Sequence, residues 1–147
     1  MTEYSEIEHL TDKDWENLCW HDNRIYGISL SYGKFHENLI IDIDYIVEWI
    51  CRPDKTCSFL ISPATLTFNQ ILDLEINIKC KHQGIYINAI HRELDKERST
   101  LPDRLYYNWK IDCHYGSHVS FGASSFSRIL RKKPILCHGQ EIPFAER

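Results

Sequence analysis

Two short groups of polar side chains are the residues whose types and spacing could support chemistry. His21 and Asp22 are adjacent in the stretch CWHDNRIYGISL, and a histidine beside a carboxylate can act as a general base or as a pair of metal ligands. Asp42 and Asp44 are two residues apart in an alternating segment, so a strand would place both carboxylates on one face, roughly 7 Å apart. Such a pair can bind a cation or polarise a water molecule.

Each group also has a simpler structural explanation. Adjacent residues in a turn rarely point into a common site, so His21 and Asp22 fit a chain reversal in which Asp22 or Asn23 accepts hydrogen bonds from nearby amides. Asp42 and Asp44 fit the solvated outer face of a half-buried antiparallel strand. We therefore predict no catalytic residues, and we predict that His21, Asp22, Asp42 and Asp44 belong to a binding surface.

The six cysteines of the chain predict free thiols, and the sequence predicts no bound metal or cofactor. Without an export signal, a reducing compartment is the expected setting for them. Several cysteines have a histidine nearby, but none of these pairs has the spacer of two to four residues that zinc sites use. The chain also lacks a phosphate-binding loop, a dinucleotide fingerprint and a Gly-x-Ser-x-Gly motif. These features favour a protein without catalytic activity.

The length and composition predict one soluble domain that covers residues 1–147. A chain of 147 residues can bury a single core without help from metal or disulfides. Its 43% hydrophobic and 26% charged residues are ordinary for a globular protein. No stretch approaches the roughly 18 to 20 apolar residues that a membrane helix needs, and the acidic start does not match a secretory signal. We therefore expect a cytoplasmic protein with no membrane partner.

Charge is distributed unevenly along the chain, whose net charge is −4. Residues 1–22 contain seven acidic side chains and one lysine, whereas residues 124–147 contain five basic and two acidic side chains. This polarity indicates a charged surface for a partner, while general affinity for nucleic acid would need a basic domain. The sequence does not determine the oligomeric state.

Two short helices are predicted, one near each end of the chain. Thr11 can cap the first helix with Asp14 completing a capping box, and this helix should run from about Asp12 to Cys19. Near the C-terminus, apolar residues at helical spacing follow two serines that can cap, and a basic run with a proline then marks the end. The apolar residues of this second helix are Phe126, Ile129 and Leu130.

The rest of the chain has the alternation of strands. In residues 39–51 the odd positions are apolar, and so long a run should bend or bulge within its length. Residues 66–80 predict two strand segments in one register or one strand kinked near Asn69, and residues 58–62 and 84–94 add two shorter strands. The expected fold is α+β and mainly β: a curved antiparallel sheet or half-barrel of six to eight strands with the two short helices.

The clearest hairpin lies in residues 105–123. A two-residue turn would send the apolar residues of its second strand to the wrong face. A three-residue loop of residues 114–116, with Gly116 in the left-handed conformation, instead sets Trp109 opposite Phe121 and Ile111 opposite Val119. The charged stretch between residues 91 and 104 is expected to be a solvent-exposed connection.

The run from Trp20 to Leu30, an aromatic residue followed by His21, Asp22 and a strand, resembles the start of small bacterial immunity proteins of contact-dependent and polymorphic toxin systems. The resemblance covers about a dozen of the 147 residues. It implies a compact α+β domain that binds and blocks a cognate toxin without catalysis. The stretches FLISPATLTF and FSRILRKKP resemble parts of uncharacterised bacterial proteins, and that likeness implies no function.

The predicted function is therefore that of a small cytoplasmic bacterial protein that binds another protein through an acidic or aromatic surface on one side of its sheet. A toxin is the partner that the resemblance implies. The alternative is a metal-dependent enzyme or a small-ligand carrier that uses the polar face around His21, Asp22, Asp42 and Asp44.

Overall fold

The computed structural model describes residues 8–34, 36–80 and 83–143. Ten strands form one antiparallel sheet, with two short 3-10 helices between them. In chain order the elements are β1 (His9–Thr11), η1 (Asp12–Asn17), β2 (Arg24–Tyr32), β3 (Glu37–Cys51), β4 (Cys57–Asn69), β5 (Leu72–Asn77), β6 (Ile85–Leu94), β7 (Tyr107–Cys113), η2 (His114–Gly116), β8 (His118–Ala123), β9 (Ser125–Leu130) and β10 (Ile135–Cys137).

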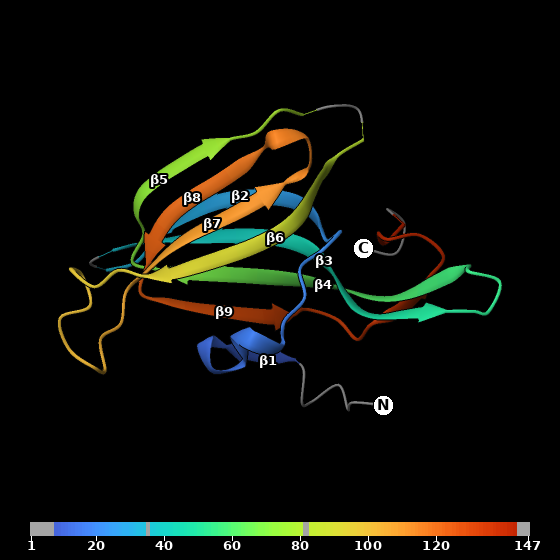
Figure 1. The fold of residues 1–147 in the computed structure, drawn as a ribbon, viewed down its shortest axis with the longest axis horizontal. Coiled ribbons are helices and arrows are strands. Elements are labelled where there is room, and N and C mark those ends of the chain that lie inside the picture. Colours follow the sequence, from blue (N-terminus) through green and yellow to red (C-terminus); the bar gives the residue numbers. More distant parts are fainter. Residues whose placement is uncertain (1–7, 35, 81–82, 144–147) are drawn as a thin grey trace.

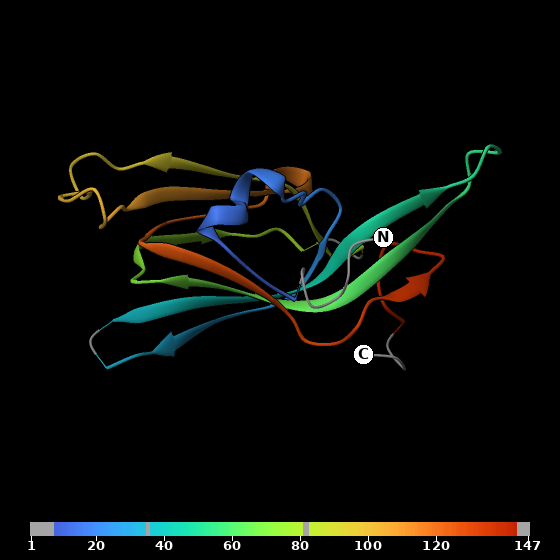
Figure 2. The ribbon, with the colours of Figure 1, turned by 90° about the horizontal axis from the view of Figure 1, so that it is seen from below.

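The sheet folds back on itself into two layers (Figures 1 and 2). One layer has the order β1-β9-β4-β3-β2, with β10 beside β4, and the other has the order β6-β7-β8-β5. Among the described residues, the strands of the two layers pair only where the first two residues of β2, Arg24 and Ile25, meet Tyr86 and Ile85 of β6. Beyond that contact β2 and β6 separate, which leaves room for a core between the layers.

Alternating apolar side chains from both layers fill this core. In β3 the odd residues Leu39, Ile41 and Ile43 are fully buried, as their alternation predicts. In the facing layer, Trp109 of β7 packs against Phe68 of β4, with ring centres 5.0 Å apart. Trp15 of η1 contacts the edge of Trp109, also at 5.0 Å, so η1 covers one side of the core.

The expected irregularity in the long strand is confirmed. The β3–β4 register shifts between Ile46 and Glu48, and this bulge reverses the side chains that follow. Trp49 is consequently 43% exposed instead of continuing the buried odd face. Beyond the bulge the β3–β4 hairpin projects from the two layers as an arm (Figure 2). A small second core of Ile46, Phe59 and Ile61 supports it.

The predicted β7–β8 hairpin is confirmed in detail. Trp109 pairs with Phe121 and Ile111 with Val119, and Gly116 has a φ of 75°. Tyr115 also adopts the left-handed conformation, with a φ of 60°. Within residues 66–80, β4 ends at Asn69 and β5 begins at Leu72, so the prediction of two strand segments is confirmed. The single register predicted for them is wrong, because the β5–β8 register shifts between Leu72 and Glu75, and Leu72 and Ile76 are about half exposed.

The mainly β, antiparallel architecture is confirmed, but the predicted helices and strand number are wrong. The first helix is a 3-10 helix that ends at Asn17, because Leu18 has an extended backbone (φ −93°, ψ 138°). Its start is as predicted, since the amide of Thr11 donates to Oδ2 of Asp14 at 3.0 Å. The described residues form ten strands instead of six to eight: β1, β9 and β10 were not predicted as strands, and the segments around Pro63 are one strand, β4.

The predicted C-terminal helix is the strand β9. Phe126, Arg128 and Leu130 are buried, whereas Ile129 is exposed, so the true period is two. Arg128 obscures that period in the sequence because arginine is rarely buried. Here its guanidinium lies 4.2 Å from the ring centre of Tyr45, and burial lowers its pKa.

The prediction of six free thiols is wrong for two cysteines. Cys51 and Cys57 pair at the tip of the β3–β4 arm and form a disulfide. Cys19 and Cys80 are exposed thiols, whereas Cys113 and Cys137 are buried. Among the described residues, no helix is long and apolar enough to cross a membrane.

Candidate functional site

Asp22 lies in the turn between η1 and β2, where its carboxylate joins three segments. Its backbone is left-handed, with a φ of 64°, and its amide donates to the carbonyl of Ile87 at 2.8 Å. Its Oδ2 lies 3.1 Å from Nδ1 of His21 and accepts a hydrogen bond from Nε2 of Gln140 at 3.0 Å. Its Oδ1 lies 3.4 Å from Nε2 of His114. Asp22 therefore ties η2 and the C-terminal segment to the start of β2.

Asp44 and Asp42 share the outer face of β3, but their surroundings differ. Asp44 is fully buried, and its Oδ2 accepts a hydrogen bond from the amide of Ile142 at 2.9 Å. Asp42 is 41% exposed, and its Oδ1 accepts a hydrogen bond from Oγ1 of Thr65 at 3.0 Å. Asp44 thus holds the C-terminal segment against the sheet, while Asp42 lies at the surface.

Charged and aromatic side chains cover the junction of β2 and β6. Arg24 forms an ion pair with Glu141, and its guanidinium lies 4.8 Å from the ring centre of Tyr26. The hydrogen bond to Glu141 raises the pKa of Arg24. Tyr86, which pairs with Arg24, stacks on His114 with ring centres 5.6 Å apart. Burial, followed by the charge of Glu141, raises the pKa of Tyr86. These contacts join the two layers and the C-terminal segment.

The four predicted residues therefore do not converge on one cavity. His21 and Asp22 do contact each other, but the second histidine beside Asp22 is His114, which sequence reasoning did not connect with it. No sequence signal could have made that connection, because the two residues meet only when β6 and β7 fold over the start of β2. No group of three or more His, Cys, Asp or Glu side chains within the described ranges could hold a metal ion.

The connection between β6 and β7 is an ordered Ω-loop of residues 95–106. Its ends are joined by a hydrogen bond from the amide of Asp95 to the carbonyl of Tyr106 at 2.9 Å. Oγ of Ser99 accepts a hydrogen bond from the amide of Tyr106 at 2.9 Å and lies 3.1 Å from its carbonyl. Loops closed in this way are often functional.

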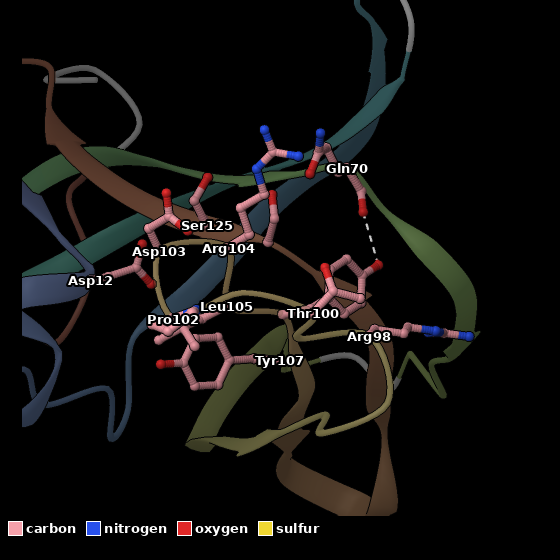
Figure 3. A pocket seen from close by; sticks show the side chains of 12 residues that line it. Asp12, Gln70, Arg98, Thr100, Pro102, Asp103, Arg104, Leu105, Tyr107 and Ser125 are labelled. Carbon is pink, nitrogen blue, oxygen red and sulfur yellow. Dashed lines mark hydrogen bonds between the residues drawn. The ribbon is translucent and has the colours of Figure 1, made fainter.

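A cavity of about 700 Å³ lies between this Ω-loop and the ends of the neighbouring strands (Figure 3). Arg98 pairs with Asp73 at 2.7 Å, and this hydrogen bond raises the pKa of Arg98. Asp12 pairs with Arg92 at 3.0 Å. The cavity is lined mainly by polar side chains: Asp12, Gln70, Arg98, Thr100, Pro102, Asp103, Arg104, Leu105, Tyr106, Tyr107, Ser124 and Ser125.

A second cavity, of about 340 Å³, adjoins the first and shares Gln70 and Tyr106 with it. The phenol of Tyr106 donates a hydrogen bond to the carbonyl of Gln70 at 2.9 Å, marked by the dashed line in Figure 3. Burial raises the pKa of Tyr106. The residues that line the second cavity come from the β2–β3 turn, the start of β3, the β4–β5 connection, the start of β5 and the end of the Ω-loop: His36, Glu37, Gln70, Ile71, Leu72 and Tyr106.

Two strand edges lie open near this second cavity, and one of them, that of β5, is at the upper margin of Figure 1. β5 pairs only with β8, and the described part of the chain places no strand on its other edge. β2 pairs with β6 through two residues only. The described part of the chain therefore also places no strand on that edge of residues 27–32. Leu72 and Ile76 of β5 are 49% and 48% exposed, and Tyr32 of β2 is 77% exposed. These apolar side chains are available to a partner.

Comparisons of the chain with family models, with curated proteins and with solved structures gave no match. The evidence on function therefore comes from the geometry of this chain.

Proposed function

We propose that this protein is a non-catalytic protein-binding module in which β5 pairs with an extended segment of a partner. The observation that carries the proposal is the free edge of β5, where Leu72 and Ile76 remain about half exposed. In strand addition, backbone hydrogen bonds supply affinity, and the side chains beside the edge supply specificity. An uncovered edge with apolar side chains also has a natural tendency to recruit another strand.

The charges on β5 indicate a basic partner segment. Asp73, which pairs with Arg98, and Glu75, which lies 3.9 Å from Nε2 of His118, have side chains that are 74% and 70% exposed, and the whole chain has a net charge of −4. Two copies paired through their β5 strands would bring these carboxylates together, and like charges across neighbouring strands are destabilising. A basic segment of a different protein is therefore the better fit.

A cytoplasmic toxin is the partner class that we propose, following the resemblance of residues 20–30 to toxin immunity proteins. The module would act by covering part of the toxin surface. Reduction of the Cys51–Cys57 disulfide in the cytoplasm would leave this site intact, because the disulfide lies at the tip of the β3–β4 arm and β5 pairs only with β8.

The experiment uses the whole chain as bait in an extract of its own cells, with mass spectrometry to identify a stoichiometric partner. Hydrogen exchange of the purified complex should then show slower exchange of the amides of residues 72–77. The double variant Glu75→Lys/Ile76→Lys should lose the partner, because it reverses a charge and removes an apolar contact on β5. The matched control is Glu48→Lys on the arm, which should retain the partner.

Equal retention by the β5 variant and by the Glu48→Lys control would place the interface elsewhere and refute the proposal. Circular dichroism of each variant checks that its fold is intact. Both substituted β5 side chains are exposed, so we expect no more than about 0.5 kcal/mol change in the free energy of unfolding for each.

A small-ligand carrier is the second candidate, because the cavity beneath the Ω-loop has a volume of about 700 Å³, within the usual range for ligand sites. Its lining includes the guanidinium of Arg104 and the hydroxyls of Ser124 and Ser125, which suit a small polar molecule. Native mass spectrometry of the protein purified from its own cells tests this function. A bound small molecule that is lost in Arg104→Ala would support it.

A further inference from the structure

We infer that the second cavity, at the start of β5, is an anchor pocket for one lysine or arginine side chain of the segment that pairs with β5. This inference rests on the proposed strand addition, and it adds the identity of the side chain that gives specificity. Edge-strand recognition commonly combines backbone pairing with a pocket for a particular side chain.

The cavity lies where a paired segment would need it. Leu72 is both the first residue of β5 and part of the cavity wall. Ile71, the preceding residue, also lines the cavity, and its amide donates to the carbonyl of Glu37 at 2.9 Å. The start of β3 and the start of β5 are therefore fixed relative to each other. A strand running along the open edge of β5 would carry one of its side chains past this opening.

The lining of the cavity matches the two parts of a long basic side chain. Ile71, Leu72 and the ring of Tyr106 supply apolar wall, against which the methylene stem of a lysine or arginine can pack. Glu37, an exposed residue in the wall of the cavity, supplies a carboxylate for the charged end. A volume of about 340 Å³ is enough for one such side chain.

Other anchors fit less well. An acidic side chain would meet the like charge of Glu37, which is unfavourable. A purely apolar side chain would cover Glu37 without giving its carboxylate a partner, and burying an unpaired charge is costly.

The wall of the pocket is held in place before any partner arrives. The hydroxyl of Tyr106 is bonded to the carbonyl of Gln70, and its ring packs on Gly122, where an added Cβ would be only 2.6 Å from Cε1. Gln70 and Asp73 both have left-handed backbones, with φ of 57° and 54°. These two residues place the sharp change of direction between β4 and β5 directly beside the cavity. A pre-organised pocket loses little entropy on binding.

The test uses two synthetic peptides and fluorescence anisotropy. Each is a fluorescein-labelled octapeptide of alternating valine and threonine with one substituted position. That position is lysine in the first peptide and norleucine in the second, which has the same stem without the charge. The native protein should bind the lysine peptide about fivefold more tightly, the effect of one partly exposed ion pair.

Two protein variants test whether Glu37 causes the preference for the lysine peptide. Glu37→Gln keeps the size of the side chain and removes its charge, so it should abolish the preference for lysine. Glu48→Gln is the matched control, because it removes an exposed carboxylate of the β3–β4 arm that neither lies on β5 nor lines the cavity. It should keep the preference.

The outcomes separate this inference from the proposed function. Equal binding of the two peptides by the native protein would refute the anchor pocket and leave strand addition standing. An unchanged preference in Glu37→Gln would also refute it. If neither peptide binds, both strand addition at β5 and the anchor pocket fail.

Discussion

Tyr106 and Gln70 are joined by a hydrogen bond of 2.9 Å between the phenol of one and the backbone carbonyl of the other. This bond connects the end of the Ω-loop to the turn between β4 and β5, and both residues line both cavities. Together with the Arg98–Asp73 ion pair, this contact therefore helps to fix the position of the loop relative to the open edge. Removing it should affect both stability and binding.

Tyr106→Phe should lower the free energy of unfolding by about 1 to 2 kcal/mol, because it removes a partly buried hydrogen bond and leaves a carbonyl unpaired. Urea denaturation followed by tryptophan fluorescence measures the change. Tyr115→Phe is a suitable control, since the Tyr115 hydroxyl bonds Gln83 at an exposed position. A loss in the control as large as in Tyr106→Phe would contradict the prediction.

Gly122→Ala should destabilise the protein by about 1 to 3 kcal/mol through overpacking. The new methyl group would lie 2.6 Å from Cε1 of Tyr106 and 3.2 Å from Nη1 of Arg98. The control is Gly139→Ala, where nothing lies within 4 Å of the added atom and no more than about 0.5 kcal/mol is expected. Thermal unfolding of both variants measures the difference, and equal melting temperatures would disprove the predicted clash.

The two aspartates of β3 should respond differently to the same substitution. Asp44→Asn weakens the charged acceptor that bonds the amide of Ile142, so we expect a loss of about 1 to 2 kcal/mol and faster hydrogen exchange in residues 138–143. Asp42→Asn changes a side chain that is 41% exposed and should cost about 0.5 kcal/mol or less. Similar losses in the two variants would show that the C-terminal segment does not depend on Asp44.

The cysteines should react with a thiol reagent in three stages. At pH 8 the native protein should expose two thiols, Cys19 and Cys80, and unfolding without reductant should expose four. Reduction should then release Cys51 and Cys57. Burial raises the pKa of Cys113 to about 11, so it stays protonated and unreactive at this pH.

Because the pKa of Cys113 is raised in the folded protein, the free energy of unfolding should fall as the pH rises above 9. The unfolded thiol ionises near its ordinary pKa of 9.0, whereas the folded thiol holds its proton until about 11. The contribution of the protonated Cys113 thiol to the free energy of unfolding is therefore fully present below pH 9 and is lost as the pH rises toward 11. Cys113→Ala should show a smaller decline over this interval. Four reactive thiols in the native protein at pH 8 would contradict this account.

The sequence by itself determined the features that depend on near neighbours in the chain. The odd residues Leu39, Ile41 and Ile43 had to share a buried face because a strand alternates its side chains. The Trp109–Phe121 pairing followed from the loop at Gly116, since a one-residue shift would have turned the apolar residues outward. These features needed no knowledge of the rest of the fold.

Only the tertiary structure decided which of the remaining residues are buried. Phe126, Ile129 and Leu130 fit a helix by spacing, but pairing with β4 and the stacking of Arg128 on Tyr45 make this segment a strand. Asp42 and Asp44 look alike in the sequence, yet the C-terminal segment covers only Asp44.

The alternation of β5 predicts one buried face, but its register with β8 shifts between Leu72 and Glu75. Leu74 packs against the core, whereas Leu72 and Ile76 remain exposed. The physical reason is the same in each case. Periodicity records which side chains lie on one face, whereas the segments that cover that face come from distant parts of the chain. Whether those segments cover the face depends on the packing of the whole molecule.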